Sequence, residues 1–267
     1  MEKIGLIAGS GKFPLIFSQY AKARGRNICA VAVKGETSKE LEDLVDRVYW
    51  VEVGQLERLF KIFKDEGITR AIMAGKISPT LLLKDDLAVD EELKELLDHA
   101  KDKRADSLLG AVARRLKKAG IDLIDSTTYL SDLLPHEGIL TQRRPSQAEW
   151  EDIRFGFDIA RKIAGLDIGQ TVVVKDKAIL AIEAIEGTDG AIRRGGALGN
   201  GEVVVVKVSK PKQDMRFDIP VVGPETIRSL TQAKASCLAI EAQKTLLIDK
   251  EEVVRLADRS GISVAVI

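Results

Sequence analysis

The stretch Lys3–Arg24, KIGLIAGSGKFPLIFSQYAKAR, contains the pattern of a strand, a turn and a helix in succession. Lys3–Ala8 is an apolar run with the length of a buried strand. The turn follows at Gly9-Ser10-Gly11, and Phe13–Arg24 has apolar residues at helical spacing. This order of elements is typical of the repeating unit of an α/β fold, in which each strand is followed by a helix.

The same alternation continues through the first half of the chain. Further strands are predicted at 27–33, 47–51, 69–74 and 121–124, and helices at 41–45, 54–66, 90–99 and 107–119. Strands that alternate with helices imply a parallel sheet with helices on both faces. The sequence therefore predicts an α/β fold whose first domain covers residues 1–134.

The pattern changes after Leu134. Pro135–Pro145 is irregular and is predicted to be a linker, and Ser146 begins a helix with Glu149 at the capping-box position. Strands are then predicted at 169–174, 178–185, 203–209, 237–241 and 245–248, and helices at 226–233 and 250–259, with a hairpin turn at 175–177. This mixture predicts a C-terminal α+β domain over residues 146–267.

Composition excludes several classes of function. The chain has 41 basic and 41 acidic residues and 4% aromatic residues, which argues against a general nucleic-acid binder. No apolar run is long enough for a membrane span, and the first residues read directly as a strand, so we expect neither a transmembrane segment nor a signal peptide. Two isolated cysteines and two distant histidines make a disulfide framework, a zinc site or a Ser-His-Asp triad improbable. A cytoplasmic protein is expected.

Glycines and lysines follow two of the predicted parallel strands. Gly9, Ser10, Gly11 and Lys12 follow the first strand, and Gly75 and Lys76 follow the strand at 69–74. Ligands of such sheets bind at the carboxyl ends of the strands, and backbone N–H groups at a helix start can hold a phosphate. The first motif is neither a P-loop nor a complete dinucleotide fingerprint, so a plain tight turn remains an alternative.

The densest group of polar residues lies in Lys210–Thr226, after an apolar strand. Gln213, Asp214, Arg216 and Asp218 lie within six positions, and Pro211, Pro220 and Pro224 restrict the backbone. Two carboxylates with an arginine between them can hold a divalent cation and a phosphate oxygen together. The alternative interpretation is a solvated loop whose arginine pairs with its neighbours.

Other polar residues lie at predicted strand ends of the second domain. Gln170 begins one strand, Glu183 and Glu186 end another, and Thr188 is expected in the loop that follows. Together with the glycines and lysines of the first domain, these groups suit metal-assisted attack of water on a phosphate ester or anhydride.

Four stretches carry a resemblance to a known family. They are AGSGKFP at 8–14, MAGKISP at 73–79, ADSLL at 105–109 and, above all, PKQDMRFDIPVVGPET at 211–226. Over essentially its whole length the chain resembles the LpxI-type UDP-2,3-diacylglucosamine pyrophosphatases. The resemblance implies a Rossmann-like N-terminal domain, a second domain, and substrate held between them. It also implies hydrolysis of UDP-2,3-diacylglucosamine to lipid X and UMP in lipid A biosynthesis, with Mg²⁺ or another divalent cation, in the Gram-negative cytoplasm.

The resemblance also assigns roles to residues. The family's essential aspartate matches Asp214, while Arg216 would contact the pyrophosphate and Asp218 would support Asp214 or the metal. Asp214 and Glu183 are the metal ligands that we expect. Substrate contacts are expected from Gly9, Ser10, Gly11, Lys12, Gly75, Lys76, Gln170, Thr188 and Gln213.

Two other functions stay open at this point. One is a non-catalytic nucleotide-sugar sensor, which would bind tightly without turnover, and the other is a metal-independent transferase, which would form glycosides instead of UMP. Small-molecule lipid ligands and no nucleic acid are the expected partners. Peripheral contact with the inner membrane and a homodimer are further expectations, the second because the closing stretch GISVAVI is apolar to its end.

Overall fold

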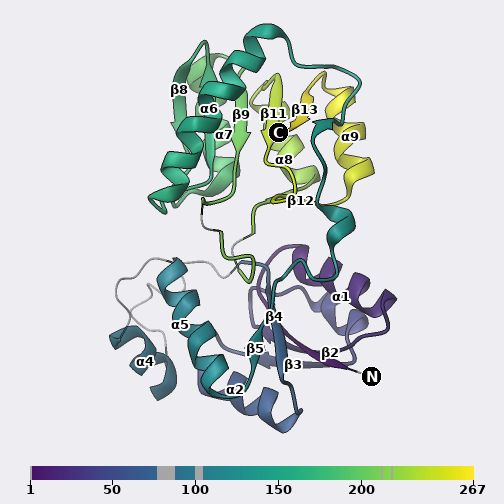
Figure 1. Ribbon diagram of the computed structural model, residues 1–267, viewed down its shortest axis with the longest axis vertical. Coiled ribbons are helices and arrows are strands. Elements are labelled where there is room, and N and C mark those ends of the chain that lie inside the picture. Colours follow the sequence, from purple (N-terminus) through teal and green to yellow (C-terminus); the bar gives the residue numbers. More distant parts are fainter. Residues whose placement is uncertain (1, 77–87, 100–104, 212, 218) are drawn as a thin grey trace. The chain divides into compact units, whose positions relative to one another are not determined.

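The computed structural model of the chain describes residues 2–76, 88–99, 105–211, 213–217 and 219–267. They form two compact units (Figure 1). Unit 1 consists of Met1–Ser131 together with the segment Asp214–Asp218, and unit 2 consists of Asp132–Gln213 and Ile219–Ile267. The sequence predicted one continuous C-terminal domain, whereas in the structure this segment belongs with the N-terminal unit.

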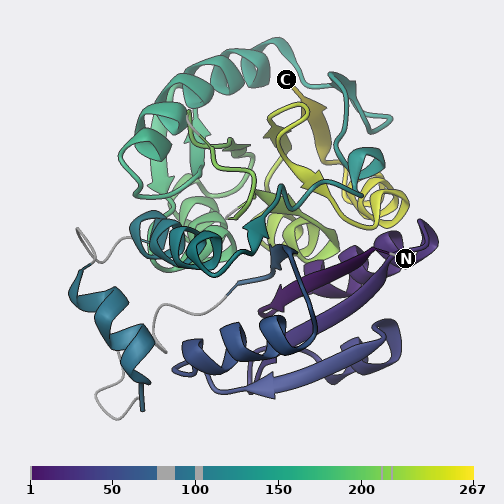
Figure 2. The ribbon, with the colours of Figure 1, turned by 60° about the horizontal axis from the view of Figure 1, so that its bottom comes forward.

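The sheet of unit 1 is entirely parallel over the described residues, with the order β3-β2-β1-β4-β5. Its strands are β1 (Lys3–Ala8), β2 (Asn27–Val33), β3 (Arg47–Val51), β4 (Arg70–Ala74) and β5 (Asp122–Leu123). Figure 2 shows the strands of this sheet pointing in one direction. The strand order reverses between β1 and β4, and in open α/β sheets ligands bind at such a reversal.

Helices cover both faces of this sheet. They are α1 (Phe13–Ala23), the short 3₁₀ helix η1 (Lys39–Leu44), α2 (Leu56–Asp65) and α5 (Ala105–Lys118), and α4 (Glu91–Asp98) packs on α2 and α5. Phe63 of α2 and Leu116 of α5 pack with Val31 and Ala71 in one apolar cluster. The alternate strand residues are buried on the opposite face, where α1 packs. The predicted parallel sheet with helices on both faces is confirmed.

The sheet of unit 2 is mixed, with the order β6-β13-β11-β9-β7-β8. Its strands are β6 (Gly138–Ile139), β7 (Thr171–Lys175), β8 (Ala178–Ile182), β9 (Val204–Lys207), β11 (Cys237–Ile240) and β13 (Ser263–Val266). Strands β9, β11 and β13 are parallel, whereas β7 runs antiparallel to both β8 and β9. A separate short pair is formed by β10 (Val221–Val222) and β12 (Leu246–Leu247).

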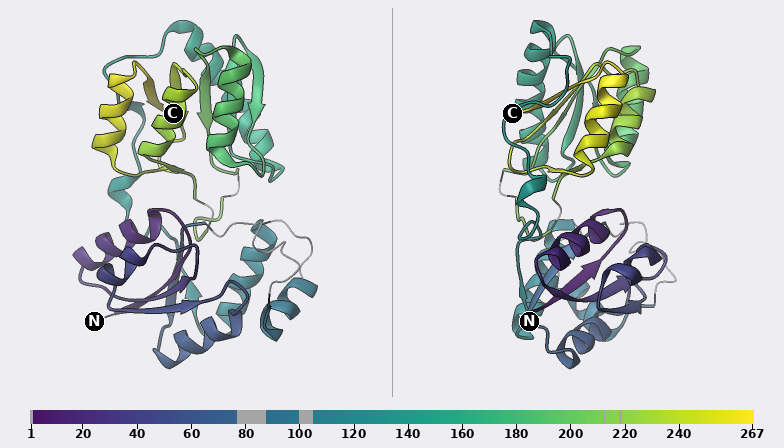
Figure 3. Two further views of the ribbon diagram at one scale, coloured as in Figure 1. Left: turned by 180° about the vertical axis from the view of Figure 1, so that it is seen from behind. Right: turned by 90° about the vertical axis from the view of Figure 1, so that its right-hand side faces the viewer.

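Four helices of the described part of unit 2 cover the two faces of its sheet (Figure 3). Helix α6 (Gln147–Gly165) packs on the side chains of Val172 and Val206. On the other face, α7 (Gly187–Gly199) packs on β7 and β8, α9 (Lys250–Arg259) packs on β13, and α8 (Pro224–Gln232) contacts both of these helices. Helix α6 begins with the predicted capping box between Ser146 and Glu149.

Two sequence predictions for this region are wrong. The predicted linker at 135–145 contains β6, which pairs with β13, and the predicted loop after β8 is helix α7. The glycines of α7 hid the helix because glycine is a poor helix former. Two of these glycines are required by tertiary packing, since a Cβ atom on Gly195 would lie 2.5 Å from Val173 and one on Gly196 would lie 2.5 Å from Ala233.

The apolar end of the chain is accommodated within unit 2. Strand β13 has β11 on one side and β6 on the other, so hydrogen-bonding partners in the same sheet occupy both of its edges. None of the helices in the described ranges combines the length and the apolar character that crossing a membrane requires.

Candidate functional site

The segment that carries Asp214 is fixed at the carboxyl ends of β4 and β5. The backbone N–H of Ser126, just after β5, donates to the carbonyl oxygen of Met215 at 2.9 Å. The Ser126 hydroxyl lies 2.7 Å from the carbonyl oxygen of Arg216 and 2.8 Å from that of Met73 in β4. Phe217 is buried in the cluster that α2 and α5 form on the sheet. These contacts bring residues 214–217 to the ligand-binding edge of unit 1.

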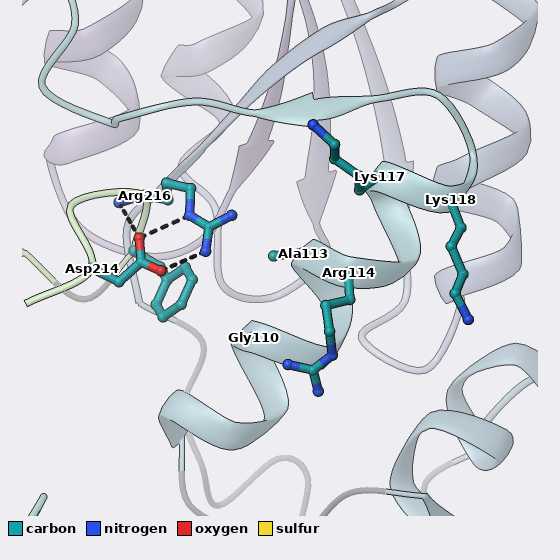
Figure 4. Close-up of a pocket in the computed structure, with 8 residues that line it drawn as sticks. Gly110, Ala113, Arg114, Lys117, Lys118, Asp214 and Arg216 are labelled. Carbon is teal, nitrogen blue, oxygen red and sulfur yellow. Dashed lines mark hydrogen bonds and ion pairs between the residues drawn. The ribbon is translucent and has the colours of Figure 1, made fainter.

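Asp214 and Arg216 form a bidentate ion pair (Figure 4). Arg216 Nε donates to Asp214 Oδ1 at 2.8 Å, Nη2 donates to Oδ2 at 2.6 Å, and the Arg216 backbone N–H donates to Oδ1 at 3.1 Å. Hydrogen bonding from Arg216 is the main cause that lowers the pKa of Asp214, against the opposing effect of burial. Asp214 is therefore ionised at neutral pH. The sequence analysis gave as an alternative a solvated loop whose arginine pairs with its neighbours, and this pairing is present. Both side chains are partly exposed.

A cavity of about 520 Å³ lies beside this ion pair, within unit 1. Its lining consists of Gly110, Ala113, Arg114, Lys117 and Lys118 of α5 with Asp214, Arg216 and Phe217. These residues of α5 were not predicted from the sequence. Helical spacing could have placed them on one helix face, but no local pattern connects α5 with a segment a hundred positions later.

The two glycine motifs of unit 1 lie against each other. Ser10 and Lys76 form an antiparallel bridge, in which the Ser10 N–H donates to the Lys76 carbonyl at 2.7 Å and the Lys76 N–H donates to that of Ser10 at 3.2 Å. A Cβ atom on Gly9 would lie 2.4 Å from the Lys76 oxygen, and one on Gly75 would lie 2.5 Å from the Ser10 oxygen. Both glycines are therefore needed for the loops to meet at the strand-order reversal between β1 and β4.

The remaining residues of the first motif lead into helix α1. Gly11 has a φ of +87°, in the region that favours glycine, and Lys12 stands at the N-cap position of α1. The structure thus brings Gly9, Ser10, Gly75 and Lys76 together, with Gly11 and Lys12 next to them.

Unit 2 has a cluster of polar side chains where β8 and β9 end and β7 and α7 begin. Thr188, in the first turn of α7, donates from its hydroxyl to Glu183 Oε1 at 2.8 Å, and the Gln170 N–H donates to Oε2 at 3.3 Å. Lys207 Nζ donates to the Thr188 hydroxyl at 2.7 Å and lies 3.9 Å from Glu183 Oε2. The predicted residues Gln170, Glu183 and Thr188 are brought together here, around a lysine that the sequence analysis missed.

This cluster is an ion pair in a nearly closed environment. The side chains of Lys207 and Glu183 are 7% and 12% exposed. Burial raises the pKa of Glu183, but Lys207 and the hydroxyls of Thr171 and Thr188 outweigh it, so the net shift of the pKa is downward. Glu183 is therefore ionised, and both of its carboxylate oxygens accept hydrogen bonds, from the Thr188 hydroxyl and the Gln170 N–H.

Further charged pairs lie close by in unit 2. Glu241, just after β11, accepts hydrogen bonds from Arg161 at 2.8 Å, from Lys244 at 2.9 Å and from the Ser209 N–H and hydroxyl at 2.8 Å. Lys210 pairs with Asp167 at 2.6 Å. Sequence reasoning missed these pairs because their members are distant in the chain.

The predicted site residues are divided between the units. Asp214, Arg216 and the two glycine motifs belong to unit 1, and Gln170, Glu183, Thr188 and Gln213 belong to unit 2. Gln213 Oε1 accepts a hydrogen bond from the Lys210 N–H at 3.1 Å. Asp218 lies outside the described residues. In the described ranges, no group of three or more His, Cys, Asp or Glu side chains is arranged to hold a metal ion.

Two solved structures show weak likenesses to this chain. A UDP-glucose-4-epimerase from Stenotrophomonas maltophila is 15% identical, with 45% of this chain and 35% of that chain covered and a TM-score of 0.28. The biotin carboxylase domain of a Hydrogenobacter thermophilus 2-oxoglutarate carboxylase is 14% identical, with 74% and 41% covered and a TM-score of 0.30. At these TM-scores and identities, neither the fold nor the function of this chain is inferred from the two structures.

Comparison of sequences is far more specific. The family model described as the LpxI N-terminal domain matches residues 3–133, and that of the LpxI C-terminal domain matches residues 136–265. The UDP-2,3-diacylglucosamine pyrophosphatase LpxI of Caulobacter vibrioides is 31% identical over 275 aligned positions, which cover 99% of this chain and 97% of that protein. On these matches, which extend over both halves of the sequence, the chain belongs to the LpxI family.

Proposed function

We infer that this protein is a UDP-2,3-diacylglucosamine pyrophosphatase and hydrolyses that substrate in lipid A synthesis. The observation that carries the inference is the match to both LpxI domains together with 31% identity to a pyrophosphatase across nearly the whole of both proteins. The cavity beside Asp214 and Arg216 is consistent with a reaction at a diphosphate group. A nucleotide-sugar sensor remains the alternative that the experiment below excludes or supports.

The reaction breaks one phosphoanhydride bond. The oxygen of water forms a bond to the sugar-side phosphorus, and the bridging oxygen leaves with UMP, so that lipid X is the second product and a proton is released. Negative charge builds up on the phosphoryl oxygens in this step, and preorganised cations and hydrogen-bond donors stabilise it.

We propose that Asp214 and Arg216 act together at this diphosphate. The lowered pKa of Asp214 makes its carboxylate a weak proton acceptor, so its contribution is charge and orientation rather than proton transfer. It holds the guanidinium of Arg216 in one plane through two hydrogen bonds. A guanidinium has five N–H donors, so others remain for phosphate oxygens. The supporting role of Asp218, which lies outside the described residues, stays a proposal.

We propose that a magnesium ion binds at this site through the carboxylate of Asp214. Mg²⁺ is usually bound by one or two carboxylates together with substrate phosphates and water, and Asp214 is a partly exposed, ionised carboxylate beside a cavity. When bound, the ion would neutralise phosphate charge and lower the pKa of a water molecule. Glu183 remains a proposed second ligand, although its oxygens accept hydrogen bonds from Thr188 and Gln170.

The glycine motifs at the strand-order reversal are the proposed nucleotide side of the site. Ser10, Lys12 and Lys76 lie where ligands of such sheets bind. In unit 2, Gln170, Thr188 and Gln213 are proposed to contact the substrate.

The proposed function can be tested by release of UMP from UDP-2,3-diacylglucosamine, with Mg²⁺ and with EDTA. We expect turnover with Mg²⁺, its loss with EDTA, and a reduction of kcat of roughly 10²-fold or more in Asp214→Asn. Asp65→Asn makes the same charge change at an exposed residue of α2 and should retain wild-type kcat. Tight binding of the substrate without UMP release by the wild-type protein would instead identify a sensor, and glycoside products would identify a transferase.

The setting of the reaction is part of the proposal. We propose that the protein works in the cytoplasm, in peripheral contact with the inner membrane that contains its lipid substrate. A homodimer is also proposed, although the closing stretch no longer supports it, because β13 is paired on both edges within unit 2. Cell fractionation and sedimentation of the purified protein test these points, and a monomer confined to the soluble fraction would contradict the last two.

A further inference from the structure

Helix α5 presents three cationic side chains to the cavity beside Asp214. Arg114, Lys117 and Lys118 line it from the helix, and Arg216 lines it from the segment 214–217 (Figure 4). Four cationic residues thus line this cavity, and among the described residues that line it Asp214 is the only one with a carboxylate. The cavity has an excess of positive charge.

Two of these four cationic residues form ion pairs with described carboxylates, and two do not. Arg216 is paired with Asp214, and Lys117 is paired with Asp122 at 2.6 Å. Of the residues whose structure is described, none places a carboxylate within ion-pairing distance of Arg114 or Lys118. The adjacent residue Arg115 differs, because it pairs with Glu92 of α4 and does not line the cavity.

Helix stability does not explain Arg114. Cations in the last turn of a helix interact favourably with its dipole, and this accounts for Arg115, Lys117 and Lys118. Arg114 precedes that turn, and it is four positions from Lys118, a spacing at which like charges repel each other. An anion held between them would remove this repulsion.

The shape of the cavity also suits an anion. Gly110 and Ala113 leave space on the helix surface, since a Cβ atom on Gly110 would meet only Arg114 Nη1, at 3.5 Å. The volume of about 520 Å³ lies within the range of small-ligand pockets. An arginine beside this space can bind two oxygens of a phosphate at once, which a lysine cannot.

We propose that Arg114 binds the diphosphate of the substrate in this cavity, opposite the Asp214–Arg216 pair. The proposal rests on the proposed function, because it takes the diphosphate from that substrate. Lys118 adds positive charge at the same site. Arg114 is then a substrate-binding residue of the reaction, at a position of α5 that none of the quoted family stretches includes.

The test compares Arg114→Ala with Arg115→Ala, which removes the same charge one position along the same helix. Release of UMP should show kcat/KM lower by about 10- to 100-fold in Arg114→Ala and within twofold of wild type in Arg115→Ala. Arg114→Lys should lie between, because it keeps the charge and loses the two-pronged geometry. Circular dichroism and thermal melting establish that each variant is folded.

A second measurement does not depend on turnover. Calorimetry with inorganic pyrophosphate at low salt should show binding to the wild-type protein and to Arg115→Ala, weaker by at least about tenfold in Arg114→Ala. If substrate is hydrolysed while Arg114→Ala matches Arg115→Ala in both assays, this proposal is overturned and the proposed function stands. If Arg114→Ala loses pyrophosphate binding while the wild-type protein releases no UMP, the anion site stands and the hydrolase does not.

Discussion

Lys207 and Glu183 are charged side chains with almost no access to water, and their energetics follow from that burial. Removing charges from water is costly, and the cost is offset only when each group keeps its partner and its hydrogen bonds. In unit 2 the pair satisfies this condition through Thr171, Thr188 and the Gln170 N–H. At the level of the residue, the pair therefore fixes the positions of proposed substrate contacts.

Replacing Lys207 by Met should leave Glu183 buried without its cation and lower the free energy of unfolding by about 3–5 kcal/mol. Urea denaturation at pH 7 measures this change in the free energy of unfolding. The double variant Lys207→Met with Glu183→Gln removes both charges and should recover part of this loss. A single variant as stable as wild type would show that the pair is not a structural requirement.

The stability of the protein should also depend on pH through Glu183. Because the folded pKa of Glu183 is lowered, its contribution to stability is present above the unfolded pKa of about 4.3 and is lost as the pH falls through the lower folded pKa.

Helix α7 shows how an element can depend on contacts that its own sequence does not reveal. The segment GTDGAIRRGGALG has five glycines, each of which lowers helix propensity. Gly195 lies against Val173 of β7, Gly196 against Ala233, and Gly199 against Leu180 of β8. Because the helix packs closely on the sheet and on Ala233, tertiary contacts stabilise it despite its low helix propensity. This packing positions Thr188, in the first turn of α7, beside Glu183.

Gly195→Ala should destabilise unit 2, although alanine is the better helix former. The added methyl group would overlap the Val173 side chain, and such overpacking costs about 1–3 kcal/mol. Gly110→Ala in α5 is the matched control, because its methyl group meets an ordinary contact at 3.5 Å and should raise stability by about 1 kcal/mol. Thermal melts of the two variants should move in opposite directions, and a raised melting temperature for Gly195→Ala would contradict the close packing.

At the scale of the whole molecule, the chain leaves unit 1 after Ser131 and returns to it at Asp214–Asp218. This return lies between the two parts of unit 2, Asp132–Gln213 and Ile219–Ile267. The return is anchored by Phe217, which is 6% exposed, and by the hydrogen bonds at Ser126. The residue proposed for catalysis, Asp214, is thereby attached to the sheet that carries the glycine motifs. The core of unit 1 is completed by a side chain from the second half of the sequence.

Phe217→Ala should therefore loosen unit 1, by about 3–5 kcal/mol. Hydrogen exchange should become faster at the amides of β4 and β5, while β9 and β11 of unit 2 remain protected. Ile153→Ala, on the buried face of α6, should give the opposite pattern. Faster exchange in β9 and β11 of the Phe217 variant would show that its side chain does not belong to the core of unit 1.

Local patterns predicted a large part of this architecture. The alternation of apolar strands with amphipathic helices indicated the parallel sheet of unit 1, and the capping box at Ser146 and the hairpin turn before Ala178 were read from adjacent residues. These features are encoded within a few positions of the chain, because dihedral preferences and burial periods act between near neighbours. The motifs around Asp214 sufficed to indicate the family for the same reason, since they are short and contiguous.

Tertiary contacts alone decided what surrounds those motifs. Ser126 and Arg216 are 90 positions apart, and no periodicity in either segment predicts that they meet. The same holds for Arg114 beside Asp214, for Lys207 beside Glu183, and for β6 beside β13. These neighbours meet only once the sheets have formed, so the side chains that complete the candidate site could be recognised only in the folded chain.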